Sequence, residues 1–253
     1  MLIPADAPLA LIGYSSDAAR ALSALGITAL NVPDGPPGDI ISACHTLKFS
    51  GALIAPTQGH AWLDAVNVDT DARRAGRVDS LSFHGAAGAQ GTFAYADALS
   101  DAVRASGYAV VGASLLIIGH RVNDMVLAAP IARLGFTDIG LAADSAPEAA
   151  RVRRELPNVP RLFPVSRRDT TIQALADRSD LVVLTGGDLP KGLLQPYHTL
   201  IDLTGNERAS TSGATLLDLY DLPAHHLVRQ LQHATGKTYS ADDLTQVSAA
   251  LAR

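Results

Sequence analysis

The chain has little cysteine and little lysine. Cys44 is the only cysteine of the 253 residues, so no disulfide can form within the chain, and its position in an amphipathic segment is typical of a core residue. The histidines lack the paired spacing of a zinc site, so we expect no metal. Lys48, Lys191 and Lys237 are the only lysines. The scarcity of cysteine favours a reducing compartment, and we expect a cytoplasmic protein.

Basic charge and long apolar runs are also scarce. The formal net charge is -5, whereas nucleic-acid-binding proteins are usually basic with clustered charge, so we expect no nucleic-acid partner. No segment approaches the roughly 20 apolar residues of a membrane span, and the N-terminus lacks the basic region of a signal peptide. We therefore expect a protein without a membrane partner that binds a small molecule, as a monomer or homodimer.

Short apolar runs alternate regularly with amphipathic segments along the chain. This alternation predicts an α/β protein with parallel sheets, and 47% hydrophobic residues suffice for a sizeable core. The predicted strands are residues 8–12, 27–32, 52–55, 78–83, 114–118, 138–142, 161–165, 181–185 and 199–203. The predicted helices are residues 17–25, 39–48, 60–66, 93–105, 122–134, 147–156, 170–177, 223–234 and 241–252. Residues 85–91 read as a loop, and a boundary is predicted near residues 106–113.

The segment 114–135 reads as a buried strand that runs directly into a helix. Such a turn can hold a pyrophosphate on the unpaired N–H groups of the helix N-terminus. Only Gly119 of the usual glycines is present, and it is followed by His120 and Arg121, whose side chains would crowd a pyrophosphate. The turn is either a degenerate dinucleotide site or an ordinary strand-to-helix connection, and Arg121 either pairs with a phosphate or faces solvent.

Several segments, in order, resemble motifs of the shikimate dehydrogenase family over nearly the full length. Residues 51–58, Gly-Ala-Leu-Ile-Ala-Pro-Thr-Gln, resemble Gly-x-Asn-Val-Thr-x-Pro-x-Lys with one residue missing. Residues 76–81, Gly-Arg-Val-Asp-Ser-Leu, resemble Gly-Ala-Val-Asn-Thr-Leu, and residues 91–97 resemble Gly-x-Asn-Thr-Asp with two residues more. Residues 180–186, Asp-Leu-Val-Val-Leu-Thr-Gly, resemble the strand and loop that cover the nicotinamide.

The resemblance implies a fold of two domains. A substrate-binding domain would comprise residues 1–106 with about 220–253, and a Rossmann-like NAD(P)-binding domain with a doubly wound parallel sheet would comprise residues 107–219. The C-terminal helices would pack back on the first domain. The implied activity is NAD(P)-linked oxidation or reduction of a small hydroxylated carboxylate of the shikimate class.

The resemblance also assigns roles to single residues. Asp97 would be the catalytic carboxylate, although without the two-residue insertion Tyr95 would take its place. Near a helix start, Asp97 could equally favour the helix dipole. The implied substrate-binding residues are Ser15, Ser16, Gln58, Asp79 and His226. The implied cofactor-binding residues are Gly119, His120, Arg121, Val122, Asp144, Thr185 and Gly186. Ser16 could also simply cap a helix, and His226, like its neighbour His225, could be an ordinary helix position.

Three departures from the family pattern bear on function. Gln58 stands at the position of the lysine that relays a proton, and an amide cannot titrate. Asp79 replaces an asparagine and would repel a carboxylate ligand unless a cationic group lies near. Asp144 stands where the family often has an arginine for the 2′-phosphate of NADP, and it would accept a hydrogen bond from a ribose hydroxyl, which favours NAD over NADP.

These observations leave three hypotheses. The first is an oxidoreductase of the shikimate dehydrogenase type. The second is a catalytically inactive or repurposed ligand-binding homologue that lacks the catalytic lysine. The third is a dehydrogenase of changed substrate, in which Asp79 and Asp97 act on a cationic, amino-acid-like ligand.

Overall fold

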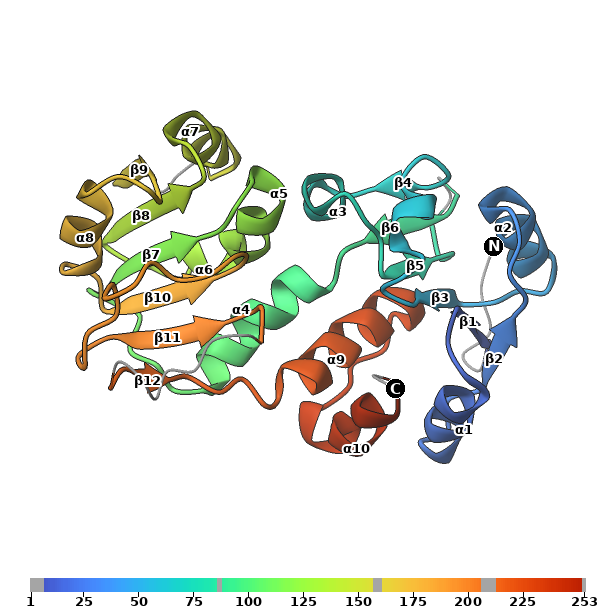
Figure 1. Cartoon of the computed structure of the whole chain (residues 1–253). Helices are drawn as coiled ribbons and strands as arrows, with labels where there is room; N and C mark the ends of the chain where they lie inside the picture. Colours follow the sequence, from blue (N-terminus) through green and yellow to red (C-terminus); the bar gives the residue numbers. More distant parts are fainter. Residues whose placement is uncertain (1–6, 86–87, 157–160, 206–212, 252–253) are drawn as a thin grey trace. The chain divides into compact units, whose positions relative to one another are not determined.

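The chain is divided into two compact units. The structure is a computed structural model, and it describes residues 7–85, 88–156, 161–205 and 213–251. One unit comprises Met1–Ala98 with Asp221–Arg253, and the other comprises Leu99–Tyr220. Within the described residues, each unit contains one sheet of six strands. The two sheets can be followed in Figure 1. The α/β class predicted from the sequence is confirmed.

The first unit has a mixed sheet in the order β2-β1-β3-β5-β6-β4. β1, β2 and β3 pair in parallel, β5 runs antiparallel to both β3 and β6, and β4 is parallel to β6. Its strands are β1 (Leu9–Ile12), β2 (Ala29–Val32), β3 (Gly51–Ile54), β4 (Asn67–Val68), β5 (Ser80–Ser82) and β6 (Gln90–Thr92). Its helices are α1 (Ser16–Ala24), α2 (Pro37–Thr46), η1 (Gly59–Trp62), α3 (Thr70–Ala75), α9 (Leu222–Thr235) and α10 (Ala241–Leu251). The helix α4 (Tyr95–Ala105) begins in this unit and ends in the other.

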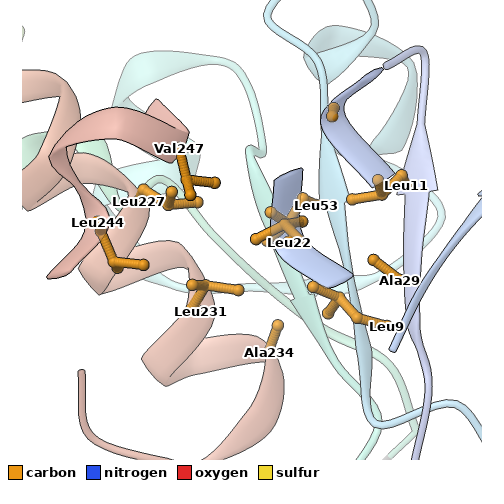
Figure 2. Packing of buried hydrophobic residues seen from close by; sticks show 11 residues of the cluster. Leu9, Leu11, Leu22, Ala29, Leu53, Leu227, Leu231, Ala234, Leu244 and Val247 are labelled. Carbon is orange, nitrogen blue, oxygen red and sulfur yellow. The ribbon is translucent and has the colours of Figure 1, made fainter. Parts of the chain in front are cut away.

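The two C-terminal helices complete the core of the first unit. α9 packs against β3 and β5, and α10 packs against α9 and α1. Figure 2 shows the resulting cluster, in which Leu227, Leu231 and Leu244 of the helices join Leu22 and Leu53 of the N-terminal segment. The prediction that these helices pack back on the first part of the chain is confirmed.

The second unit has a fully parallel sheet in the order β12-β11-β10-β7-β8-β9. This order reverses beside β7, as in doubly wound nucleotide-binding sheets, where ligands collect at the carboxyl ends of the strands. The strands are β7 (Ser114–Ile118), β8 (Asp138–Ala143), β9 (Leu162–Ser166), β10 (Leu181–Leu184), β11 (Thr199–Asp202) and β12 (Thr215–Leu216). The helices are α5 (Val122–Met125), η2 (Val126–Ala128), α6 (Ala129–Ala132), α7 (Ala146–Glu155) and α8 (Thr171–Ala176).

The predicted continuous helix 122–134 is wrong. The segment is instead the sequence α5, η2 and α6, and Gly135 follows with a φ of 115°. Pro130 lies in the first turn of α6 and has no N–H to continue an α-helical ladder, which explains the break.

Three smaller expectations also differ from the structure. α1 begins at Ser16, so Ser15 is the N-cap and it makes no side-chain capping bond. The segment 60–66 forms only the 3-10 turn η1, and the predicted loop 85–91 contains the start of β6 at Gln90, with residues 86–87 outside the description. The predicted end of the last helix at Ala252 also lies outside it. β4, α3 and β12 were not predicted, because strands of two residues and a one-and-a-half-turn helix carry too little periodicity.

The helices are short. Within the described parts of the chain, none has the length and apolarity that crossing a bilayer would demand.

Candidate functional site

A buried carboxylate lies immediately before β5. Asp79 is 5% exposed, and its Oδ1 accepts a hydrogen bond from the Ala94 N–H at 2.8 Å. Its Oδ2 accepts one from the Tyr95 N–H at 3.1 Å. These N–H groups belong to the start of α4, whose N-terminal dipole favours a negative charge. Asp79 is therefore held in one orientation by the backbone.

His226 also contacts the Asp79 carboxylate. Its Nε2 lies 2.7 Å from Asp79 Oδ2, and the Tyr95 ring meets the imidazole edge-on with centroids 5.4 Å apart. The Asp79 side chain is 7% exposed and the His226 side chain 22%. The structure thus brings together two of the predicted substrate-binding residues. A carboxylate beside Nε2 favours the tautomer with its proton there and leaves Nδ1 as the acceptor.

The same face of α9 is tied to β5 by side chains that the sequence did not single out. Gln230 Nε2 donates to the Asp79 carbonyl at 3.0 Å, and Ser80 Oγ donates to the Gln230 carbonyl at 3.0 Å. Ser80 Oγ also lies 3.0 Å from His233 Nδ1. His226, Gln230 and His233 recur at intervals of four and three, so their helical spacing was the signal available in the sequence.

Burial controls the other titratable groups near Asp79. It raises the pKa of Tyr14 to about 12, although a hydrogen bond to Gln230 partly opposes the shift, and the Asp79 charge adds to it. Burial also raises the pKa of Tyr95 and lowers the pKa of His233. Near neutral pH both phenols therefore keep their protons, and His233 favours its neutral form.

Gln58 is engaged elsewhere. It follows β3, and its Nε2 donates to Asp34 Oδ1 at 2.9 Å. Ser15 and Ser16 are exposed at the start of α1, and Asp97 is exposed in the first turn of α4. The Asp79 carboxylate already has three hydrogen-bond partners, so the structure gives less support to the third hypothesis, in which Asp79 and Asp97 act on a cationic ligand.

In the second unit, the turn after β7 packs closely. Gly119 is buried, and a Cβ there would lie 2.6 Å from both Met125 Cγ and Thr185 Oγ1. Arg121 is the exposed N-cap of α5, and its N–H donates to Asp124 Oδ2 at 3.2 Å. A carboxylate of the chain therefore lies at the helix N-terminus where a pyrophosphate is expected. Asp124 was not predicted from the sequence, although an acid at the third helical position is typical of a capping box.

His120 forms a charged cluster with Asp144 and Arg167. His120 Nδ1 lies 3.2 Å from both carboxylate oxygens of Asp144 and 3.2 Å from Arg167 Nη1. Arg167 also donates to the Asp188 carbonyl. A Cβ on Gly187 would lie 2.5 Å from His120 Nε2, so the loop after β10 runs directly against this ring.

The cluster changes the electrostatics that the sequence suggested. The hydrogen bond from His120 is the main reason that the pKa of Asp144 is lowered, and the charges of His120, Arg167 and Arg168 add to it. Two arginines beside Asp144 offset its repulsion of a 2′-phosphate. The charge at the end of β8 therefore does not distinguish NAD from NADP.

Two observations bear on whether the turn after β7 fits a dinucleotide. Its backbone fits, because the buried Gly119 keeps the close approach between β7, α5 and β10 that such turns need. Asp124 Oδ2 accepts from the Arg121 N–H of this turn and would have to turn aside. The His120 ring, which lies against Asp144, Arg167 and Gly187, would have to leave room for the phosphates. The His120 side chain is 48% exposed, so its movement breaks no core packing.

No group of three or more His, Cys, Asp or Glu side chains in the described parts of the chain is arranged to hold a metal ion.

Comparison with solved structures identifies the fold. Quinate dehydrogenase from Corynebacterium glutamicum in complex with NAD is 16% identical, with a TM-score of 0.71 over 97% of this chain and 99% of that chain. Shikimate 5-dehydrogenase from Listeria monocytogenes in complex with shikimate and NAD is 14% identical, with a TM-score of 0.73 over 98% of each chain. The Thermus thermophilus enzyme in complex with NADP(H) and shikimate is 18% identical, with a TM-score of 0.68 over 96% of this chain and 98% of that chain. No protein-family model and no curated protein match the sequence.

Proposed function

We propose, because the chain has the two-domain fold of the shikimate and quinate dehydrogenases, that it is an NAD(P)-linked oxidoreductase acting on a small hydroxylated carboxylate. The single observation that carries the proposal is the Asp79–His226 pair. Oxidation of a hydroxyl requires a group that accepts its proton, and a histidine oriented by a carboxylate can do so. The pair occupies two positions that the motif resemblance assigns to substrate binding.

The other proposed roles follow the motif resemblance. Ser15 and Ser16, exposed at the start of α1, would bind the substrate carboxylate, Gln58 would lie beside the substrate, and Asp97 would be the catalytic carboxylate. The cofactor, which supplies or accepts a hydride when bound, would be held by Gly119, His120, Arg121, Val122, Asp144, Thr185 and Gly186. The peptide groups of the turn would face its phosphates, and Asp144 would accept from a ribose hydroxyl.

The test is an assay of the purified protein with shikimate and quinate, each with NAD and with NADP. We expect reduced nicotinamide to accumulate with one of the four combinations. As a control for traces of a host dehydrogenase, a preparation from cells that do not produce this chain is purified in parallel and assayed in the same way. Accumulation at equal rates in both preparations would show that the activity does not belong to this chain.

A second candidate is a ligand-binding homologue without catalysis. Two observations favour it: the Asp124 carboxylate at the N-terminus of α5, and the amide of Gln58 at the position of a catalytic lysine. Thermal shift measurements with NAD, NADP, shikimate and quinate discriminate the candidates, because a ligand stabilises the folded state that binds it. Stabilisation by a dinucleotide supports the oxidoreductase. Stabilisation by a hydroxylated carboxylate alone supports the binder.

A further inference from the structure

We propose that His226 is a catalytic residue that exchanges a proton with the substrate hydroxyl through Nδ1, and that Asp79 positions its ring. The inference rests on the proposed function and adds to it the group that replaces the missing lysine. In this role the substrate O–H bond breaks and its proton passes to Nδ1. The C–H bond at the same carbon breaks, its hydride passes to the oxidised nicotinamide, and a C=O bond forms. The reverse reaction returns the proton from the imidazolium to the new hydroxyl.

The structure fixes the imidazole from one side only. Asp79 is buried and bound by two backbone N–H groups, so it cannot rotate away from His226 Nε2. The histidine itself remains partly exposed, at 22% of its side chain. Its ring is also packed edge-on against Tyr95. This combination leaves one ring nitrogen bound and the other available to a ligand.

The groups around the pair leave His226 as the one suited to this exchange. Several charged or titratable side chains contact His226 or act electrostatically on its neighbours. They are Tyr14 before α1, Asp69 before α3, Arg77 and Asp79 before β5, His84 after β5, Tyr95 on α4 and His233 on α9. Both tyrosines hold their protons too tightly near neutral pH, and burial disfavours the charged form of His233. Gln58 has no titratable group at all.

A purely structural role for His226 is the competing explanation. The bond to Asp79 does tie α9 to the start of β5, but three further contacts already do so: Gln230 to the Asp79 carbonyl, and Ser80 to both Gln230 and His233. Asp79 also keeps two backbone donors without His226. The histidine is therefore not required to hold the helix or to satisfy the carboxylate.

The kinetic test compares H226Q and D79N with H225Q. His225 is the adjacent histidine on α9 and lies outside the pair, so H225Q controls for the loss of an imidazole from this helix. We expect H226Q to lower kcat for hydroxyl oxidation by about 10²- to 10⁴-fold, the usual contribution of a general base. H226Q should also abolish the acidic limb of the kcat/KM–pH profile. H225Q should leave both kcat and this profile unchanged.

D79N tests the positioning role. The Asp79 carboxylate accepts from two backbone N–H groups and, through Oδ2, from His226 Nε2. An asparagine has one oxygen and an NH2 group that can only donate, so Nε2 no longer faces an obligatory acceptor and the ring loses its fixed tautomer. We expect kcat to fall while KM changes little. The acidic limb of the kcat/KM–pH profile should shift along the pH axis. The double variant D79N/H226Q should be no slower than H226Q alone, because the two side chains act as one unit.

A second readout does not depend on turnover. Nitrogen NMR of the imidazole reports which ring nitrogen bears the proton. We expect neutral His226 to carry it on Nε2 in the wild-type protein and to lose this preference in D79N. Neutral His226 protonated on Nδ1 in the wild-type protein would overturn the inference, whatever the kinetics show.

The outcomes also separate the inference from the proposed function. Turnover by the wild-type protein with unchanged kcat and pH profile in a folded H226Q variant would overturn the inference and leave the oxidoreductase in place. No turnover with any hydroxylated carboxylate and either dinucleotide would overturn both. Circular dichroism and thermal unfolding of each variant confirm that the protein measured is folded.

Discussion

At the residue scale, two carboxylates of the chain accept hydrogen bonds from backbone N–H groups at the start of a helix. Asp79 lies at the N-terminus of α4, and Asp124 lies at that of α5. The two have opposite consequences. Asp79 has a histidine partner, which supports the proposed proton transfer, whereas Asp124 lies where a ligand phosphate would bind. An acidic side chain at a helix N-terminus would therefore favour the proposed proton transfer at α4 and oppose phosphate binding at α5.

Asp124 gives a prediction on cofactor binding. The D124N variant keeps an oxygen that can accept from the Arg121 N–H but removes the negative charge from the helix N-terminus. We expect NAD or NADP to bind about two- to fivefold more tightly, in line with the roughly 0.3–1 kcal/mol of a charge at this place. Calorimetric titration measures the change, with N123A as the control from the same exposed turn. Equal affinities of D124N and wild type would show that Asp124 does not oppose the phosphates.

At the element scale, the position of α9 decides the candidate site. The helix carries His226, Gln230 and His233 on the face that meets β3 and β5. It can approach the sheet because Gly51 of β3 has no side chain: a Cβ there would overlap the backbone oxygens of Leu81 and Ala234. The site therefore depends on a glycine that makes no contact with the pair.

The close approach at Gly51 predicts a large effect on stability. The G51A variant must push α9 or β5 away, so we expect it to lower the free energy of unfolding by about 3 kcal/mol or more. Gly38 on α2 is the matched control, because a Cβ there has open space and an ordinary backbone conformation. G38A should be as stable as wild type or up to ~1 kcal/mol more stable. Urea unfolding of both variants measures the difference, and a G51A protein of wild-type stability would contradict the packing.

His233 predicts how stability depends on pH. Burial lowers its pKa in the folded protein below the ordinary value of 6.5, so below that value the unfolded chain binds more protons than the folded one. The free energy of unfolding then falls as the pH drops through 6.5 towards the folded-state pKa. H233N, which cannot titrate, should lose less stability than wild type between about pH 7.5 and about pH 5.5. Parallel urea titrations at the two pH values test this, and equal losses would exclude His233 as a contributor.

At the scale of the whole molecule, the two units differ in how the chain builds them. The second unit is one continuous segment, Leu99–Tyr220, whereas the first is assembled from Met1–Ala98 and Asp221–Arg253. The core of the first unit needs both pieces, because Leu227, Leu231 and Leu244 pack with residues of β1, β3 and α1. The Asp79–His226 pair also joins the two pieces, across 147 positions of sequence.

This difference predicts how fragments of the chain behave. Residues 95–220, which include all of α4, should fold alone because their parallel sheet and its core are complete. Residues 1–98 should not, because without α9 and α10 the apolar side chains of β1 and β3 lie uncovered. Adding residues 221–253 in trans should restore folding. Circular dichroism and urea unfolding of each fragment decide the matter, and cooperative unfolding of residues 1–98 alone would contradict the prediction.

The sequence alone determined most elements of the fold, because apolar runs and helical periodicity are local properties. β7 was predicted at its observed bounds, and the α/β class and the packing of the last helices followed from the order of the motifs. The antiparallel β5 and β6 and the break at Pro130 were not predicted, because pairing partners and ladder geometry arise only on folding.

The same division holds for the candidate site. The sequence supplied Asp79 and His226 as separate substrate-binding candidates, and the motif resemblance placed Gln58 at the position of a lysine. Only the tertiary structure placed His226 Nε2 2.7 Å from the Asp79 carboxylate and set Asp124 on the start of α5. Contacts of this kind depend on how a helix docks on a sheet and how a side chain turns back on its own helix. Those arrangements are fixed by packing of the whole core, which no local pattern encodes.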